Sequence, residues 1–229
     1  MGVHPMNNCT KRPLPEKLAS LCIALLFAIG MQGAHAIPFG GIEFPDGLIS
    51  FADAVTDYSP LFGGGPGPTD TDFTDPTKAL GAPDYVAPIG AVSLGDGGRI
   101  TLEFINNKLT GSGDASFDLH IFEVGPDVED TFVEISMDGM VWFSVGKVFG
   151  STSSIDIDAF GFGLLDEFAF VRLRDDPNEG SNTGSTVGAD IDSVGAISTV
   201  STPTIPEPST LALFGLGLAG LGFTRKRKA

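Results

Sequence analysis

Four acidic residues lie in or beside segments whose sequence pattern predicts β-strands, and such strands could bring their carboxylate oxygens close together. Asp118 and Glu123 bracket one apolar run, and Asp190 and Asp192 take alternate positions in another. Because successive side chains of a strand point to opposite faces, Asp190 and Asp192 are expected on one face. Calcium binds about six to eight oxygen ligands, many of them carboxylates. These four residues are therefore the predicted Ca²⁺ ligands.

Ion pairing is the alternative to a metal at these positions. A carboxylate buried in a sheet is costly unless a cation or an ion pair compensates it. Two basic residues, Arg172 and Arg174, are near in sequence and can supply that pair. An EF-hand loop is absent, and the series Asp70, Asp72 and Asp75 is a weaker loop candidate for the same ion.

The residues that could carry catalysis do not form a recognised set. His120 is the single histidine after residue 36, which excludes a histidine-based zinc site, and no G-x-S-x-G motif occurs. Asp156 and Asp158, or Asp175 and Asp176, have the spacing of a glycosidase pair, but such spacings arise by chance in an acidic chain. The sequence therefore predicts no enzymatic activity.

Trp142 is a candidate platform for stacking against a sugar. It follows an Asp138-Gly139 hairpin turn on a returning strand, which favours a place in the core instead. The core position is therefore the prediction.

These side chains must be positioned by strands, because helical periodicity is nearly absent. Short alternating runs are separated by clusters of Gly, Asp and Pro, which is typical of an all-β fold. Segment 117–124 is less polar on both faces than the other strands and is expected to be central, and segment 57–77 is expected to be loop. The expected strands lie within 48–55, 99–104, the central 117–124, the hairpin 132–145, 154–158, 168–175 and 189–198.

Residues 1–36 have the parts of an export signal. A basic region precedes an apolar run at 18–29, and Ala34 and Ala36 form an A-x-A cleavage site. Both cysteines lie in this leader. The predicted cut after Ala36 therefore leaves no disulfide, thiolate zinc site or cysteine nucleophile.

The segment 37–205 is strongly acidic. It holds 27 of the Asp and Glu residues and six of the Lys and Arg residues of the chain. A chain of this charge is expected to repel nucleic acid and to attract cations. For most of these carboxylates, an acidic surface that keeps the protein soluble outside the cell is the preferred interpretation.

The last 24 residues form a three-part tail. Pro206, Glu207 and Pro208 come first and keep the chain extended. The sixteen uncharged residues 209–224 follow, and as a helix they span about 24 Å, slightly less than a bilayer core of about 30 Å. Four cations end the tail and are expected to stay cytoplasmic: Arg225, Lys226, Arg227 and Lys228. A plain membrane anchor is one interpretation.

The order of these parts resembles the PEP-CTERM sorting signal of Gram-negative bacteria. The resemblance rests on Pro206-Glu207-Pro208-Ser209, the Leu/Gly/Ala-rich run and the basic end. It implies export by the Sec machinery, a membrane-inserted intermediate and cutting by an exosortase near the tripeptide. It also implies a species that makes extracellular polysaccharide.

The segment from about 75 to 198 resembles bacterial cell-surface modules with a galactose-binding-like jelly roll. The motifs that carry the resemblance are Ala79-Leu80-Gly81-Ala82-Pro83-Asp84, residues 92–104, Asp118 to Glu123, Val133 to Trp142, and Asp190 to Ile197. Such modules often bind glycans through loops at one end and hold a structural Ca²⁺.

Together these features predict a signal peptide at 1–36, one antiparallel, jelly-roll-like β-sandwich at 37–198, a Ser/Thr/Pro linker at 199–205 and a sorting signal at 206–229. The expected function is that of an exported, non-enzymatic surface or matrix protein associated with exopolysaccharide, with glycan and calcium as ligands. A secreted carbohydrate-active hydrolase and a structural matrix protein without a ligand are the alternatives.

Overall fold

The computed structural model describes residues 36–124, 129–150, 152–180, 183–202 and 217. Nearly all regular structure in this part is strand, with four short 3-10 helices. The strands are β1 (Ile37–Phe39), β2 (Ile42–Phe44), β3 (Ala54–Ser59), β4 (Val92–Ser93), β5 (Arg99–Glu103), β6 (Asn107–Leu109), β7 (Leu119–Glu123), β8 (Thr131–Ser136), β9 (Phe143–Val148), β10 (Thr152–Ile155), β11 (Phe170–Asp175), β12 (Asp190–Ala196) and β13 (Thr199–Ser201). The 3-10 helices are η1 (Gly47–Ser50), η2 (Thr71–Phe73), η3 (Pro76–Ala79) and η4 (Asp158–Phe160).

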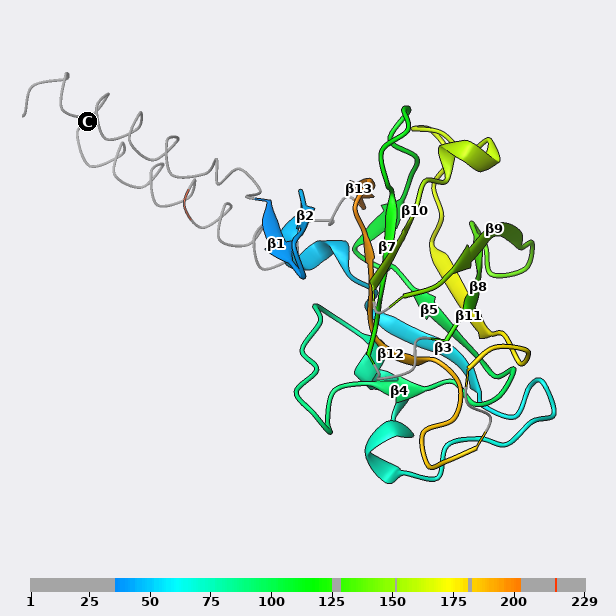
Figure 1. Cartoon of the computed structure of the whole chain (residues 1–229). Helices are drawn as coiled ribbons and strands as arrows, with labels where there is room; N and C mark the ends of the chain where they lie inside the picture. Colours follow the sequence, from blue (N-terminus) through cyan, green and yellow to red (C-terminus); the bar gives the residue numbers. More distant parts are fainter. Residues whose placement is uncertain (1–35, 125–128, 151, 181–182, 203–216, 218–229) are drawn as a thin grey trace, which may run out of the picture. The chain divides into compact units, whose positions relative to one another are not determined.

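Two antiparallel sheets form the body of the domain (Figure 1). One has the strand order β10-β7-β12-β4, and the other has the order β3-β5-β11-β8-β9. Successive strands cross repeatedly from one sheet to the other, as in a jelly roll. The predicted all-β sandwich is therefore confirmed, and β7 is central in its sheet as expected.

Apolar side chains from both sheets meet in one core. Leu119 and Ile121 of β7 are buried with Ile100 and Leu102 of β5, as the alternating pattern of these strands predicts. A second cluster joins Phe44, Phe51 and Phe122. Both clusters consist of residues between positions 39 and 197, so the domain contains its own core.

The β1–β2 hairpin covers the outer face of the four-stranded sheet. Phe122 points outward from β7 and is only 4% exposed, because the rings of Phe44 and Phe51 lie 6.2 and 6.3 Å from its own. Together with the core on the inner face, this cover buries all five residues of β7. The outer face of the five-stranded sheet carries polar and aromatic side chains that remain partly exposed.

Two sequence predictions near the N-terminal end were wrong. The expected strand 48–55 begins with helix η1, and the strand itself is β3, which runs on to Ser59. The expected loop 57–77 begins inside β3 and also contains η2 and the start of η3. Carboxylates hold the first turns of these two helices: Asp70 accepts from the Asp72 N–H at 3.1 Å, and Asp75 from the Thr77 N–H at 3.0 Å. Side-chain hydrogen bonds therefore stabilise short helical turns that the amino-acid composition of this segment does not predict.

The domain also extends beyond its predicted end. Strand β13 pairs with β6, so Thr199 to Ser201 of the expected linker 199–205 belong to the fold. No helix among the described residues is long and apolar enough to cross a bilayer. The predicted leader 1–36 and sorting tail 206–229 lie outside the described residues, apart from Ala36 and Gly217.

Candidate functional site

The outer face of the five-stranded sheet carries two cross-strand rows of polar side chains. Strand pairing sets Asp57, Thr101, Arg172 and Glu134 side by side in one row. In the next row Arg174 lies between Arg99 and Phe132, and Phe132 in turn pairs with Lys147. Because side chains of one face recur every second residue, both rows lie on the solvent side of the sheet.

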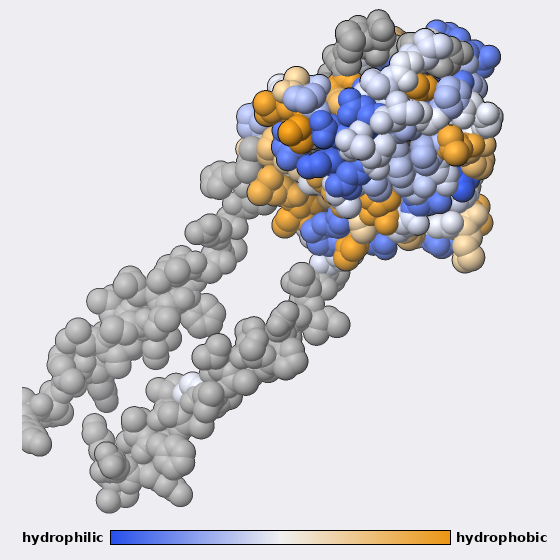
Figure 2. Space-filling view, turned by 90° about the horizontal axis from the view of Figure 1, so that it is seen from below, coloured by the Kyte–Doolittle hydropathy of each residue, from blue (hydrophilic) through white to orange (hydrophobic). Residues whose placement is uncertain are grey.

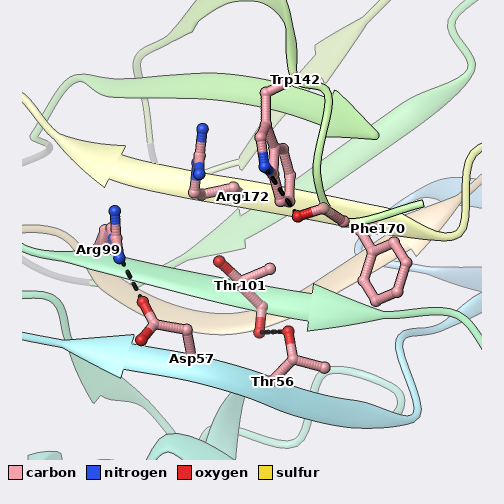
Figure 3. Close-up of a pocket in the computed structure, with 8 residues that line it drawn as sticks. Thr56, Asp57, Arg99, Thr101, Trp142, Phe170 and Arg172 are labelled. Atoms are coloured by element: carbon pink, nitrogen blue, oxygen red, sulfur yellow. Dashed lines mark hydrogen bonds and ion pairs between the residues drawn. The ribbon is translucent and has the colours of Figure 1, made fainter. Parts of the chain in front are cut away.

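These rows surround an open depression of about 380 Å³ (Figure 3). It is lined from three strands and the β8–β9 loop by Thr56, Asp57, Arg99, Thr101, Gly139, Trp142, Phe170 and Arg172. Guanidinium, carboxylate, hydroxyl and aromatic groups therefore face the same space. This combination suits a ligand with both hydroxyl groups and apolar ring faces.

Each arginine of the depression is held by one carboxylate and one aromatic ring. Arg99 Nε donates to Asp57 Oδ2 at 2.9 Å, and its guanidinium lies 4.0 Å from the ring centre of Phe62. Arg172 binds Glu134 at 2.8 Å and lies 3.9 Å from the ring centre of Trp142. These contacts fix the direction of guanidinium groups that retain further N–H donors.

Trp142 does not lie in the core, contrary to the prediction. Its backbone is in the loop between β8 and β9, because the Asp138 carboxylate accepts the N–H groups of Met140 and Val141 and widens the turn. The indole N–H donates to the Gly139 carbonyl at 3.2 Å, which holds the ring half-buried at the rim of the depression. The platform role that the sequence left as second choice is thus the one that its position allows.

A second depression of about 200 Å³ continues the same face. Phe132, Glu134, Ser144 and Arg174 line it. The Arg174 and Lys147 charges lie 5.3 and 5.4 Å from the ring centre of Phe132. Glu134 connects the two depressions, since it lines this one and binds Arg172 of the other.

Four of the six basic residues between positions 37 and 205 lie on this face: Arg99, Lys147, Arg172 and Arg174. Lys147 binds Asp130 and Asp176, and this lysine holds the pKa of Asp176 down to about 2. Arg174 is exposed and makes no ion pair within the part of the chain that the structure describes. The sequence shows that Arg99 and Thr101 alternate with apolar residues in one strand, as do Phe170 and Arg172 in another. It does not show that these four side chains lie on the same face, because that depends on which strands pair.

The four predicted calcium ligands do not converge. Asp118 and Glu123 stand at opposite ends of β7, and five residues of strand span about 16 Å. Asp118 instead lies with Asp156 and Asp158, where one carboxylate oxygen of each is within 4.8 Å of the others. Among the described residues neither predicted arginine partner binds Asp118: Arg172 pairs with Glu134 on the other sheet, and Arg174 is in no ion pair.

A β-bulge separates the environments of Asp190 and Asp192. The bulge lies between Ile191 and Ser193, and it breaks the alternation that the prediction assumed. Asp190 accepts from the Ser93 hydroxyl, whereas Asp192 accepts from the Asp84 N–H at 3.1 Å. Burial raises the pKa of both carboxyls to about 6.

Glu123 is only 4% exposed at the other end of β7. Its Oε1 accepts from the Glu129 N–H at 3.0 Å, and its Oε2 has no hydrogen-bond partner among the described residues. Burial raises the pKa of Glu123 to about 8, and the charges of Glu129, Asp190 and Asp175 act in the same direction. A neutral, protonated Glu123 is therefore favoured near neutral pH.

His120 is packed under the aromatic cluster rather than placed at a surface site. It is 2% exposed, its ring lies 4.5 Å from that of Phe122, and its Nδ1 is paired with the Ser154 hydroxyl. Burial lowers the pKa of His120 to about 4. The surrounding side chains thus favour a neutral imidazole.

Figure 2 shows a face of the domain that is mostly hydrophilic, with hydrophobic residues in separate small groups. This agrees with the acidic composition of the segment 37–205. A broad apolar docking surface is not seen on this face.

Three solved structures are similar to parts of this chain at low sequence identity. CpGH89CBM32-6 produced by Clostridium perfringens is 14% identical, with a TM-score of 0.30 over 46% of this chain and 72% of its own. The C-terminal domain of a chitobiase from Bacteroides fragilis is 11% identical, with a TM-score of 0.39 over 66% of this chain and 95% of its own. CpGH89CBM32-4 of C. perfringens is 13% identical, with a TM-score of 0.36 over 66% and 98%. No curated protein matches the chain significantly.

The C-terminal tail has a specific counterpart. Residues 204–228 match the family described as the PEP-CTERM protein-sorting motif. The match contains the predicted sorting residues Pro206 to Ser209 and the basic residues Arg225 to Lys228, all of which lie outside the described residues. The chain thus carries a PEP-CTERM protein-sorting motif, joined to a domain that is an antiparallel β-sandwich.

Proposed function

We propose that this chain is an exported, non-enzymatic surface or extracellular-matrix protein that binds an acidic polysaccharide on the outer face of its five-stranded sheet. Its PEP-CTERM motif marks an exported protein. In this proposal the Sec machinery exports the chain, the apolar tail holds it in the inner membrane, and an exosortase then cuts near Pro206-Glu207-Pro208.

The cross-strand pairing of Arg99 with Arg174 is the observation that carries the proposal. Like charges directly opposite each other in a sheet are unfavourable. Asp57 neutralises Arg99, while Arg174 has no such partner among the described residues. A carboxylate of a polysaccharide placed between these two residues would relieve the repulsion and gain charge-assisted hydrogen bonds.

The aromatic groups of the same face suit a sugar rather than a simple anion. Trp142 and Phe170 line the first depression, and Phe132 lines the second. Pyranose rings have apolar faces that pack on aromatic side chains and hydroxyl rims that hydrogen-bond to charged ones. Two adjoining depressions fit consecutive units of a polymer better than one small molecule.

The carboxylates of the face support binding over hydrolysis. A glycosidase needs one carboxylic acid to donate a proton and a second carboxylate to attack or to activate water. Asp57 and Glu134 are instead bound to Arg99 and Arg172. Because both carboxylates are engaged in ion pairs within the protein, neither is free to approach a glycosidic oxygen or a water molecule.

Titration calorimetry on residues 37–205 tests the proposal. Alginate supplies carboxylates on every unit, and dextran is a neutral comparison. Binding to alginate is expected to weaken as salt is raised, because salt screens the attraction between the cationic side chains of this face and the carboxylates of the polymer. Arg174→Gln is expected to raise the Kd for alginate about tenfold. Lys78→Gln, which removes a basic residue of η3, is the matched control and is expected to bind like the unaltered domain.

Three outcomes would overturn the proposal. No saturable binding to either polymer would favour a structural matrix role without a ligand. If alginate and dextran bind equally well and Arg174→Gln changes neither Kd, the binding site is not on the outer face of the five-stranded sheet. Release of new reducing ends from alginate would identify a hydrolase.

A further inference from the structure

Three carboxylates meet where the β7–β10 ladder ends. Asp118 immediately precedes β7, and Asp156 immediately follows β10. Because Leu119 pairs with Ile155, Asp118 and Asp156 are the next cross-strand neighbours. Asp158, the first residue of η4, completes the group, and one oxygen of each carboxylate lies within 4.8 Å of the others. Among the described residues, no ion pair involves any of the three.

Asp118 is the least compensated member of this cluster. Its exposed fraction is 0%, and its Oδ2 accepts the Ile157 N–H at 2.8 Å. Its Oδ1 makes no hydrogen bond of ordinary geometry within the described part of the chain, and burial raises the pKa of this carboxyl against the smaller, opposing effect of the nearby Ser198 and Ser112 hydroxyls. A fully buried carboxylate oxygen without a partner is costly, so its position beside two further carboxylates calls for a positive charge.

The surrounding backbone is held close to the cluster. Asp158 Oδ2 accepts from the Ser112 hydroxyl at 3.2 Å and from the Gly113 N–H at 3.1 Å. A side chain at Gly111 would place its Cβ 2.7 Å from Asp158 Oδ2 and 2.4 Å from the Phe162 carbonyl oxygen. Residue 111 therefore has no room for a Cβ, and the Phe162 carbonyl oxygen lies on the same side of this glycine as Asp158.

The geometry points to a site for one hard divalent cation, with Ca²⁺ as the expected ion, held by Asp118, Asp156 and Asp158. The cluster offers oxygen donors, which Ca²⁺ prefers, and not the nitrogen or sulfur donors that are usual for Zn²⁺. Three ligands leave room for carbonyl and water oxygens in the larger Ca²⁺ shell. Of the four residues that the sequence predicted as ligands, this site contains Asp118 alone. It is independent of the polysaccharide-binding face, which lies on the other sheet.

A cation at this position would fasten the η4 loop to the end of the β7–β10 ladder. The ion would bind the folded domain and not the unfolded chain, so its binding would stabilise the fold by mass action. For a domain of this size, Ca²⁺ at about 100 times its Kd is expected to raise the Tm by roughly 5–10 °C.

Calorimetry and thermal unfolding of residues 37–205 test the site. Titration with CaCl₂ is expected to give one site per chain, and Ca²⁺ is expected to raise the Tm more than Mg²⁺ at equal ionic strength. Asp156→Asn, at a half-buried position, is expected to weaken Ca²⁺ binding at least about tenfold. Asp114→Asn, in the exposed part of the same loop region, is the matched control and is expected to bind like the unaltered domain.

Thermal unfolding in the presence of a chelator distinguishes a carboxylate that binds the metal from one that only supports the fold. Without Ca²⁺ the three carboxylates repel one another, so Asp156→Asn is expected to raise the Tm, and with Ca²⁺ it is expected to lower it relative to the unaltered domain. Asp158→Asn supplies a second variant if the first does not fold. The absence of a Ca²⁺-dependent shift, or an equal shift in both asparagine variants and the unaltered domain, would overturn the site.

Discussion

The guanidinium of Arg172 lies 3.9 Å from the ring centre of Trp142, so the one tryptophan of the chain contacts the outer face of the five-stranded sheet, where we propose that polysaccharide binds. The same guanidinium binds Glu134 at 2.8 Å. The indole therefore helps to fix the direction of a side chain that lines the larger depression.

Trp142→Ala is expected to weaken alginate binding by about 5- to 30-fold, because the sugar loses an aromatic packing surface worth about 1–2 kcal/mol and Arg172 loses the ring that orients it. Binding of alginate to the unaltered domain should change the tryptophan fluorescence, which serves as the assay. Trp142→Phe keeps a ring and should lose less affinity than Trp142→Ala, measured by calorimetry. Equal Kd values for all three proteins would contradict the role of the ring.

The sorting tail is tested on the full chain in an exporting, exosortase-containing host. Changing Pro206 and Glu207 to Ala should prevent cutting, so the product should keep its apolar tail and remain in the membrane fraction. Mass spectrometry of the C-terminal peptide measures this directly. Pro203→Ala, just before the matched segment 204–228, is the control. An identical C-terminus in the double variant and the unaltered chain would rule out recognition of the tripeptide.

Stability is expected to fall with rising pH because of Glu123. Its pKa is raised to about 8 from an ordinary value of 4.5, so the folded state binds the proton more tightly than the unfolded state. The contribution is complete below about pH 4.5 and is lost as pH rises through about 8. His120 acts oppositely, since a pKa lowered to about 4 gives stability that is lost below about pH 6.5.

The window from pH 6.5 to 8 therefore isolates Glu123, because Asp190 and Asp192, at about 6, have largely ionised by then. Urea unfolding should show a decline across this window, and Glu123→Gln should flatten it. Glu43→Gln, at an exposed position of β2, is the control. If the unfolding free energy of Glu123→Gln declines with pH at the same slope, the effect belongs to another titratable group.

The β1–β2 hairpin is expected to be essential to the domain. Phe44 is fully buried, with its ring 4.7 Å from that of Phe51, and Phe44→Ala should cost about 3–5 kcal/mol of unfolding free energy. Phe149 is 72% exposed, and Phe149→Ala should change stability by less than about 0.5 kcal/mol. Denaturant unfolding compares the two variants. Similar losses of unfolding free energy would mean that packing of the hairpin on the sheet does not stabilise the domain.

The sequence by itself determined the export tail and the class of fold. The PEP-CTERM motif depends on residues that are adjacent in the chain, so no folding was needed to recognise Pro206 to Ser209 and the basic end. The period-two alternation in β5, β8 and β11 identified the strands and the side chains that the core buries, because that pattern is a local property of a strand.

The tertiary structure decided which distant residues share a site. Strand order placed Arg174 opposite Arg99, and an alternating pattern contains no information on which strands pair. The β-bulge between Ile191 and Ser193 gave Asp190 and Asp192 different partners, and the Asp138 carboxylate moved Trp142 out of its strand. Asp118 could be recognised as an uncompensated acid from the sequence, but its proximity to Asp156 and Asp158 follows from the pairing of β7 with β10. Such contacts depend on burial and register across the whole domain, which short-range sequence patterns do not specify.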